Sequence, residues 1–96
     1  MPLFHFLGLD KPGALQLRLD TRPAHLAHVT EFVRLGGPIL DDNGQPMGSA
    51  MIVEADSLED AQAKLAEDPY AKAGLFATTQ LRPWRVAIGT LPGYAG

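Results

Sequence analysis

Residues 38–55, PILDDNGQPMGSAMIVEA, decide the fold because a turn signal separates two extended segments. Pro38 to Asp41 and Ser49 to Ala55 are short apolar runs, and each predicts a strand. Between them lies Asp42-Asn43-Gly44, which contains the Asn-Gly pair that strongly favours a hairpin turn. The stretch therefore predicts two strands joined by a reversal of the chain.

A helix and another strand are predicted upstream. Asp20 or Thr21 can cap a helix with Pro23 in its first turn, and Gly36-Gly37 is a stop signal. Residues 2–9 are aromatic-rich and apolar on both alternating faces. A short run of this kind indicates a strand that is covered on both sides.

A second helix and a fourth strand are predicted downstream. Ser57 is a helix cap, and Asp60 stands where a capping box usually has Glu or Gln. Residues 76–88 are extended and alternating, while Pro83 favours an edge position in the sheet. Residues 89–96 form a tail rich in Gly and Pro.

This order of elements predicts an α+β, ferredoxin-like fold, βαββαβ, within a single domain of residues 1–96. Right-handed crossovers give a four-stranded antiparallel sheet with both helices on one face. Leu3 and Leu7 oppose Phe4 and Phe6 in the first strand, so the other face is apolar too. A large exposed apolar face predicts a homodimer that packs sheet against sheet.

Composition excludes several classes of protein. The chain has 96 residues, a net charge of −3 and eight scattered Lys and Arg, which disfavours nucleic-acid binding. It has no apolar run of membrane-spanning length and no basic stretch at its start, so neither a membrane span nor a signal peptide is expected. The lack of cysteine excludes disulfides and favours a cytoplasmic location.

His25 is the first candidate for a functional residue. On a helical wheel it falls inside the apolar arc, between Leu26 and Val29 on one side and Phe32 on the other. One interpretation is a core histidine with a single hydrogen bond. The other is a general base, kept neutral by its expected place in the first helical turn.

Asp68 is the second candidate, because an acid at the C-terminal end of a helix opposes the helix dipole. It can instead cap a new helical turn that begins at Pro69. The predicted topology makes the two helices antiparallel. His25 and Asp68 are therefore expected at the same end of the molecule.

Other polar residues near this end have two interpretations each. Arg22 clamps an anionic substrate or is simply solvated. Ser49 is a substrate hydrogen-bond donor or a structural residue, and Tyr70 lines a site or packs in the core. His25 and His28 have a spacing that can bind metal, but no third ligand is identifiable, so no metal is expected.

Five short motifs resemble the YciI-like family in order and spacing. They are Arg22-Pro23-Ala24-His25-Leu26, Gly37-Pro38, Gly48-Ser49, Asp68-Pro69-Tyr70 with Ala73-Gly74, and Arg82-Pro83-Trp84. The resemblance covers nearly the whole chain. It implies a dimeric α/β-barrel and an active site in which His25 and Asp68 match the family's histidine and aspartate. A relative in the family acts as a dehydrochlorinase on a chlorinated hydroxyquinol.

Together these features predict an enzyme that needs no cofactor and acts on a small organic molecule. His25 is the expected general base, and Asp68 orients its ring. Arg22, Ser49 and Tyr70 are the expected substrate-binding residues. Elimination or isomerisation fits this set, and the alternative is a dimeric domain that binds a small molecule, or serves an accessory role, without catalysis.

Overall fold

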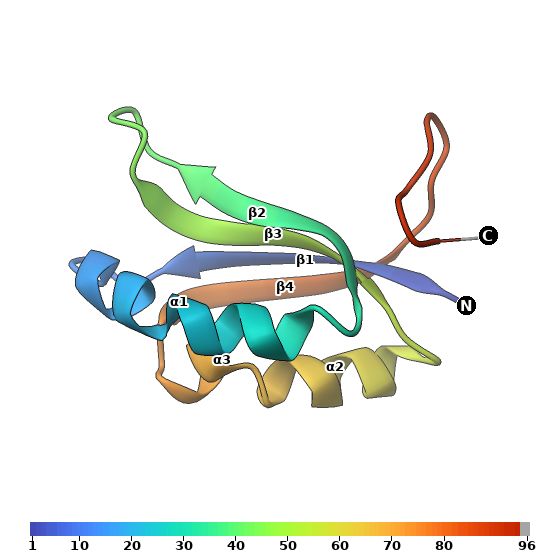
Figure 1. Cartoon of the computed structure of the whole chain (residues 1–96), viewed down its shortest axis with the longest axis horizontal. Helices are drawn as coiled ribbons and strands as arrows, with labels where there is room; N and C mark the ends of the chain where they lie inside the picture. Colours follow the sequence, from blue (N-terminus) through green and yellow to red (C-terminus); the bar gives the residue numbers. More distant parts are fainter. Residues whose placement is uncertain (95–96) are drawn as a thin grey trace.

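A four-stranded antiparallel sheet forms the centre of the molecule, with strand order β2-β3-β1-β4 (Figure 1). The computed structural model describes residues 1–94. The strands are β1 (Leu3–Asp10), β2 (Val33–Leu40), β3 (Pro46–Glu54) and β4 (Phe76–Trp84). β4 lies at an edge, which is where Pro83 is tolerated because its missing N–H is not needed there.

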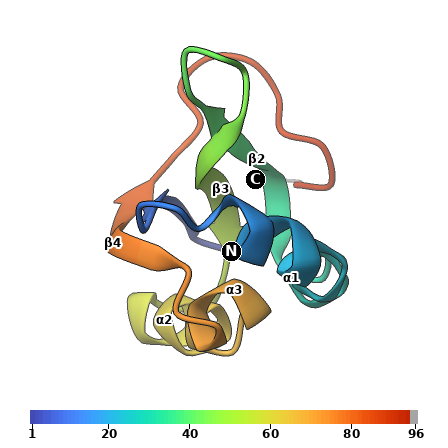
Figure 2. The same cartoon turned by 90° about the vertical axis from the view of Figure 1, so that its left-hand side faces the viewer.

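Three helices lie on one side of the sheet (Figures 1 and 2). They are α1 (Leu15–Val29), α2 (Leu58–Ala66) and the short α3 (Pro69–Lys72). The order of elements confirms the predicted ferredoxin-like α+β fold, with α3 as an added turn. The predicted cap of α2 is also confirmed, since the Ser57 hydroxyl accepts a hydrogen bond from the Asp60 N–H at 3.0 Å.

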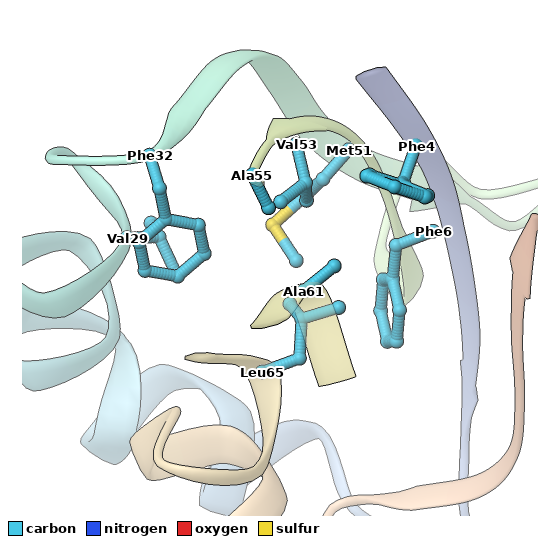
Figure 3. Close-up of a cluster of buried hydrophobic side chains, with 9 residues drawn as sticks. All are labelled: Phe4, Phe6, Val29, Phe32, Met51, Val53, Ala55, Ala61 and Leu65. Atoms are coloured by element: carbon cyan, nitrogen blue, oxygen red, sulfur yellow. The ribbon is translucent and has the colours of Figure 1, made fainter. Parts of the chain in front are cut away.

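The main core lies between this face of the sheet and the helices (Figure 3). Alternate residues of a strand point to the same face, so Phe4 and Phe6 of β1 meet Met51 and Val53 of β3 there. The helices add three buried side chains to the cluster, namely Val29, Ala61 and Leu65. This packing sets the position of α1 above the sheet.

The start of α1 was predicted wrongly. The helix begins at Leu15 rather than at residue 20 or 21, and Pro23 lies inside it. Local signals favoured the later start, but the turn before Pro23 is anchored by Arg18, whose side chain is buried and bonded to Asp10. His25 therefore lies in the third turn, and the dipole argument for its first-turn position does not hold.

The end of α1 was also predicted wrongly. The helix stops at Val29, and Gly36-Gly37 lies inside β2. Neither glycine has the positive φ of a helix C-cap. Pairing with β3, in which Gly36 faces Met51 and Gly37 faces Ala50, overrides the local stop signal.

Three strand boundaries differ from the prediction as well. β2 and β3 are longer than residues 38–41 and 49–55, because the hairpin pairs as far as Val33 with Val53. β4 ends at Trp84 rather than at residue 88, since Trp84 pairs with Leu3 near the start of β1. Beyond that point the sheet offers no partner.

The second face of the sheet is partly covered by the C-terminal segment, residues 85–94. Leu91 packs on Leu3 and Ile52 in a small buried cluster, and the Tyr94 hydroxyl donates to the Met1 carbonyl at 2.8 Å. The predicted tail thus contributes packing, and its last two residues, 95 and 96, lie outside the described part. Among the helices of residues 1–94, none combines the length and apolar character needed to cross a membrane.

Close contact between β1 and β3 requires glycine at position 48. A Cβ atom there would stand 2.5 Å from the Gly8 carbonyl oxygen, a backbone atom that cannot swing aside. We expect Gly48→Ala to lower the free energy of unfolding by about 1–3 kcal/mol, the usual cost of overpacking. Urea denaturation measures this difference.

Gly37→Ala in β2 is the matched control, because nothing lies within 4 Å of a Cβ atom at that position. Its effect should stay within about 0.5 kcal/mol. Equal stability of the two variants would contradict the close approach of β1 and β3 beside Ser49.

Candidate functional site

A cavity of about 390 Å³ opens between α1 and the β2–β3 half of the sheet. This volume is within the range of small-molecule sites, roughly 300–1,000 Å³. Arg18, Arg22 and His25 line it from α1, and Ser49 lines it from β3. Gly36 and Gly37 of β2 also line the cavity, and a Cβ atom at Gly36 would meet Met51 Cγ at 3.1 Å.

His25 and Asp68 form a buried pair at one end of this cavity. Nδ1 of His25 lies 2.8 Å from Oδ1 and 2.9 Å from Oδ2 of Asp68. An ionised carboxylate only accepts hydrogen bonds, so Nδ1 carries the proton and donates it. In the neutral form of the ring this tautomer has its lone pair on Nε2.

Nε2 of His25 is open to the cavity. It makes no hydrogen bond to any described residue, and no buried side-chain nitrogen or oxygen among residues 1–94 lacks a partner. Nε2 must therefore be reachable by solvent, and the ring is part of the cavity wall. The arrangement leaves a basic nitrogen facing the hollow while Asp68 holds the ring from behind.

Asp68 owes its position to a helix cap. Its Oδ1 accepts a hydrogen bond from the Tyr70 N–H at 3.0 Å, and Pro69 occupies the first position of α3. The predicted cap is thus confirmed, and the same carboxylate also holds His25. Asp68 is only 1% exposed, so water does not compete for its oxygens.

Tyr70 connects the two ends of the cavity wall. Its ring stacks on His25 with centroids 3.9 Å apart and planes 14° apart, and the Arg18 guanidinium carbon lies 4.7 Å from the ring centroid. Burial raises the pKa of Tyr70, while the charges of Arg18 and Arg22 act in the opposite direction. The phenol is therefore neutral at ordinary pH.

Arg18 forms a second buried charged pair, with Asp10. Its Nε donates to Oδ2 at 2.6 Å and its Nη2 to Oδ1 at 2.8 Å. Nη2 also donates to the Ser49 hydroxyl oxygen at 2.9 Å. Burial alone would lower the pKa of Arg18, but the hydrogen bonds and charge of Asp10 raise it, so the guanidinium stays charged.

The five predicted site residues thus surround one cavity. Arg22, His25, Ser49 and Tyr70 line it directly, and Asp68 lies behind His25. His28 is directed elsewhere, since its Nε2 donates to the Lys64 carbonyl at 2.8 Å. The two histidines on α1 therefore have separate protein partners.

Arg18 and Asp10 were missed by the sequence analysis. The signal was present in the spacing of Arg18, Arg22, His25 and Val29, which repeats every three or four residues along one helical face. It was not recognised because the helix was predicted to begin after Arg18. The eight-residue separation from Asp10 to Arg18 carries no local signal, since a loop lies between them.

Fold and site together define a class: a ferredoxin-like protein with a small-molecule cavity between helix and sheet and a buried His-Asp pair in its wall. The model of the YCII-related domain matches residues 3–85. Protein YciI of Escherichia coli O6:H1 is 35% identical over 94 residues, covering 86% of this chain and 96% of that protein. The chain therefore belongs to the YCII-related family.

A solved structure shares both sequence and fold with the chain. It is the 5-chloro-2-hydroxyhydroquinone dehydrochlorinase TftG of Burkholderia phenoliruptrix AC1100, in complex with 2,5-dihydroxybenzoquinone. It is 37% identical, with a TM-score of 0.78, over 86% of this chain and 93% of that one. An antibiotic biosynthesis monooxygenase shares the fold alone. Its TM-score is 0.59 at 10% identity, and the match covers 92% of this chain and 100% of that one.

The raised pKa of Tyr70 is directly measurable. The chain has two tyrosines, so in a Tyr94→Phe variant the ultraviolet absorbance of tyrosinate reports Tyr70 alone. We expect a midpoint above the ordinary value of 10.0 because the ring is buried. The folded state holds this proton more tightly than the unfolded state, so the stabilisation is complete below about pH 10 and is lost as pH rises through the raised pKa.

The same titration in urea supplies the reference for the unfolded chain. A midpoint in the folded variant at or below that of the unfolded chain would show that Tyr70 is not desolvated between His25 and Arg18.

Proposed function

We propose that the protein is an enzyme in which His25 and Asp68 act as a general acid/base pair on a small organic molecule, in a lyase or isomerase reaction. The observation that carries this proposal is the geometry of the ring: Nδ1 is held by Asp68, and Nε2 is open to the cavity. A neutral imidazole with a free lone pair accepts protons near pH 7.

The proposed reaction begins when Nε2 of His25 takes a proton from a carbon or hydroxyl group of the substrate. The ring then carries a positive charge, which the Asp68 carboxylate stabilises through its two contacts with Nδ1. The electron pair left on the substrate moves to form a double bond. In an elimination a leaving group departs with its own electron pair, and in an isomerisation the proton returns at another atom.

Neither reaction consumes an oxidant or a reductant, so the proposal includes no cofactor. The 37% identical dehydrochlorinase supports the elimination, because removal of HCl follows this scheme. Loss of HCl from a chlorinated hydroxyhydroquinone leaves a hydroxyquinone, which balances atoms and electrons. Halogenated or otherwise activated phenols are the substrates to test first.

Replacing the base should nearly abolish activity. We expect the wild-type protein to release chloride from 5-chloro-2-hydroxyhydroquinone in buffer with a chelator and no added cofactor. His25→Ala should lower this rate by about 10²- to 10⁴-fold, the usual contribution of a positioned general base. A chloride electrode measures the release.

His28→Ala is the matched control, because His28 lies one turn further along the same helix and bonds to the Lys64 carbonyl. Its rate should stay near that of the wild type. Full turnover in His25→Ala would refute the assignment. Binding of the substrate without release of chloride would favour the alternative, a small-molecule-binding or accessory domain.

We also propose that the chain forms a homodimer through the sheet face opposite the helices, in the cytoplasm. Leu9, Leu35 and Trp84 remain 37–58% exposed on that face despite the C-terminal segment. A cluster of exposed apolar side chains on a sheet face favours burial against a second copy.

Leu35→Glu should therefore convert a dimer into a monomer, because it places a charge in the proposed interface. Light scattering coupled to gel filtration measures the mass. Leu17→Glu on α1 is the control, since Leu17 is also partly exposed but lies on the helical side. A wild-type protein with the mass of one chain would rule out the dimer.

A further inference from the structure

The charged groups in the cavity wall have one sign. Arg18 and Arg22 line the cavity beside the imidazole of His25, and no aspartate or glutamate is among its lining residues within the described chain. Asp10 and Asp68 both lie behind the groups that they hold. A ligand in the cavity thus meets the cationic and donor groups and not the carboxylates that balance them.

Arg18 has donor capacity left over. Asp10 takes Nε and one hydrogen of Nη2, and Ser49 takes the other. Nη1 takes no part in the bonds to Asp10 and Ser49, and the Tyr70 phenol is a further polar neighbour that helps to raise the pKa of Arg18. Since every buried side-chain nitrogen in residues 1–94 has a partner within hydrogen-bond distance, Nη1 is reachable by solvent. The Arg18 side chain is nevertheless only 4% exposed, so its small open part faces the cavity that it lines.

Ser49 has a donor left over as well. Its oxygen accepts from Arg18 and donates to no residue in the described part of the chain, which leaves the hydroxyl hydrogen for a ligand. Ser49 is 3% exposed and lines the same cavity. Arg18 Nη1 and the Ser49 hydroxyl therefore form an adjacent pair of donors, fixed in place by Asp10.

Apart from Thr30 at the C-terminal end of α1, the wall beyond these groups is mostly apolar. Leu26, Val29, Val33 and Met51 line it. The donors and the base lie at different points along the helix, because residues 18 and 25 are two turns, or about 10 Å, apart. A ligand that spans them needs an apolar body with a negatively charged oxygen at one end.

We propose that Arg18 and Ser49 are the oxyanion-binding residues of this site, with Asp10 as the positioning residue, and that the substrates are small apolar molecules bearing a carboxylate, phenolate or enolate oxygen. The inference rests on the function proposed above and names its substrate class. Asp10 holds the guanidinium by two bonds, so the remaining N–H groups are aimed before the ligand arrives.

The test compares two ligands of nearly equal shape, benzoate and benzamide, by NMR titration of the labelled protein. Only benzoate carries a charge, and a hydrogen bond to a charged group is stronger than one to a neutral group. Wild-type protein should bind benzoate at least about ten-fold more tightly than benzamide.

Arg18→Gln should abolish this preference while leaving benzamide binding largely unchanged. The double variant Asp10→Asn/Arg18→Gln should also lose the preference for benzoate. It leaves no unpaired buried charge at position 10, so it can be tested even if Arg18→Gln alone fails to fold. Asp10→Asn alone should reduce the preference, since it loosens the aim of the guanidinium. Arg34→Gln is the matched control. Nε of Arg34 lies 2.6 Å from Oε1 of Glu54, the same distance as between Nε of Arg18 and Oδ2 of Asp10, but Arg34 does not line the cavity.

Equal affinities for the two ligands in the wild type, or no binding of benzoate, would overturn the proposal. So would a preference that persists in the double variant. The outcome is independent of catalysis, because His25→Ala should keep the preference for benzoate. A protein that discriminates the ligands but releases no chloride would retain the oxyanion site and lose the enzymatic function.

Discussion

The two bonds from the Asp68 carboxylate to Nδ1 of His25 tie α1 to the corner between α2 and α3. The carboxylate is also the cap of α3, so one side chain sets a helix start and the orientation of the ring. A buried carboxylate is costly unless its oxygens are satisfied. Here the Tyr70 N–H and Nδ1 of His25 satisfy the oxygens of Asp68. Because Nδ1 points to Asp68, Nε2 on the other side of the ring faces the cavity.

The same principle appears at the other end of the cavity. Arg18 is buried and is held by Asp10, which lies where β1 ends. Tyr70 contacts both His25 and Arg18, so the two pairs share one aromatic wall. In each pair a carboxylate lies behind a cationic or basic group and leaves that group's free side to the cavity. The lining groups are thus held in place by protein partners, and the wall presents donors and a base but no carboxylate.

Prediction from the sequence succeeded where local chemistry is decisive. The Asn-Gly turn, the Ser57 cap and the Asp68-Pro69 cap act within a few residues, and the structure contains all three. It failed at both ends of α1, where local signals compete with distant partners. The Asp10 pairing extends the helix back to Leu15, and pairing with β3 draws Gly36-Gly37 into a strand. Such contacts depend on residues far along the chain.

By itself the sequence determined the order of the elements and the ferredoxin-like topology, and it brought His25 near Asp68, although it placed His25 in the first turn of α1 and the structure has it in the third. Hydrophobic periodicity and crossover handedness suffice for these, because they depend on pattern and chain direction. Only the tertiary structure decided that Arg18 is buried beside Ser49 and that Nε2 faces an open hollow. Those features arise from packing between β1, α1 and β3. Distances between residues of different elements cannot be predicted from local sequence patterns, because they depend on how the elements pack together.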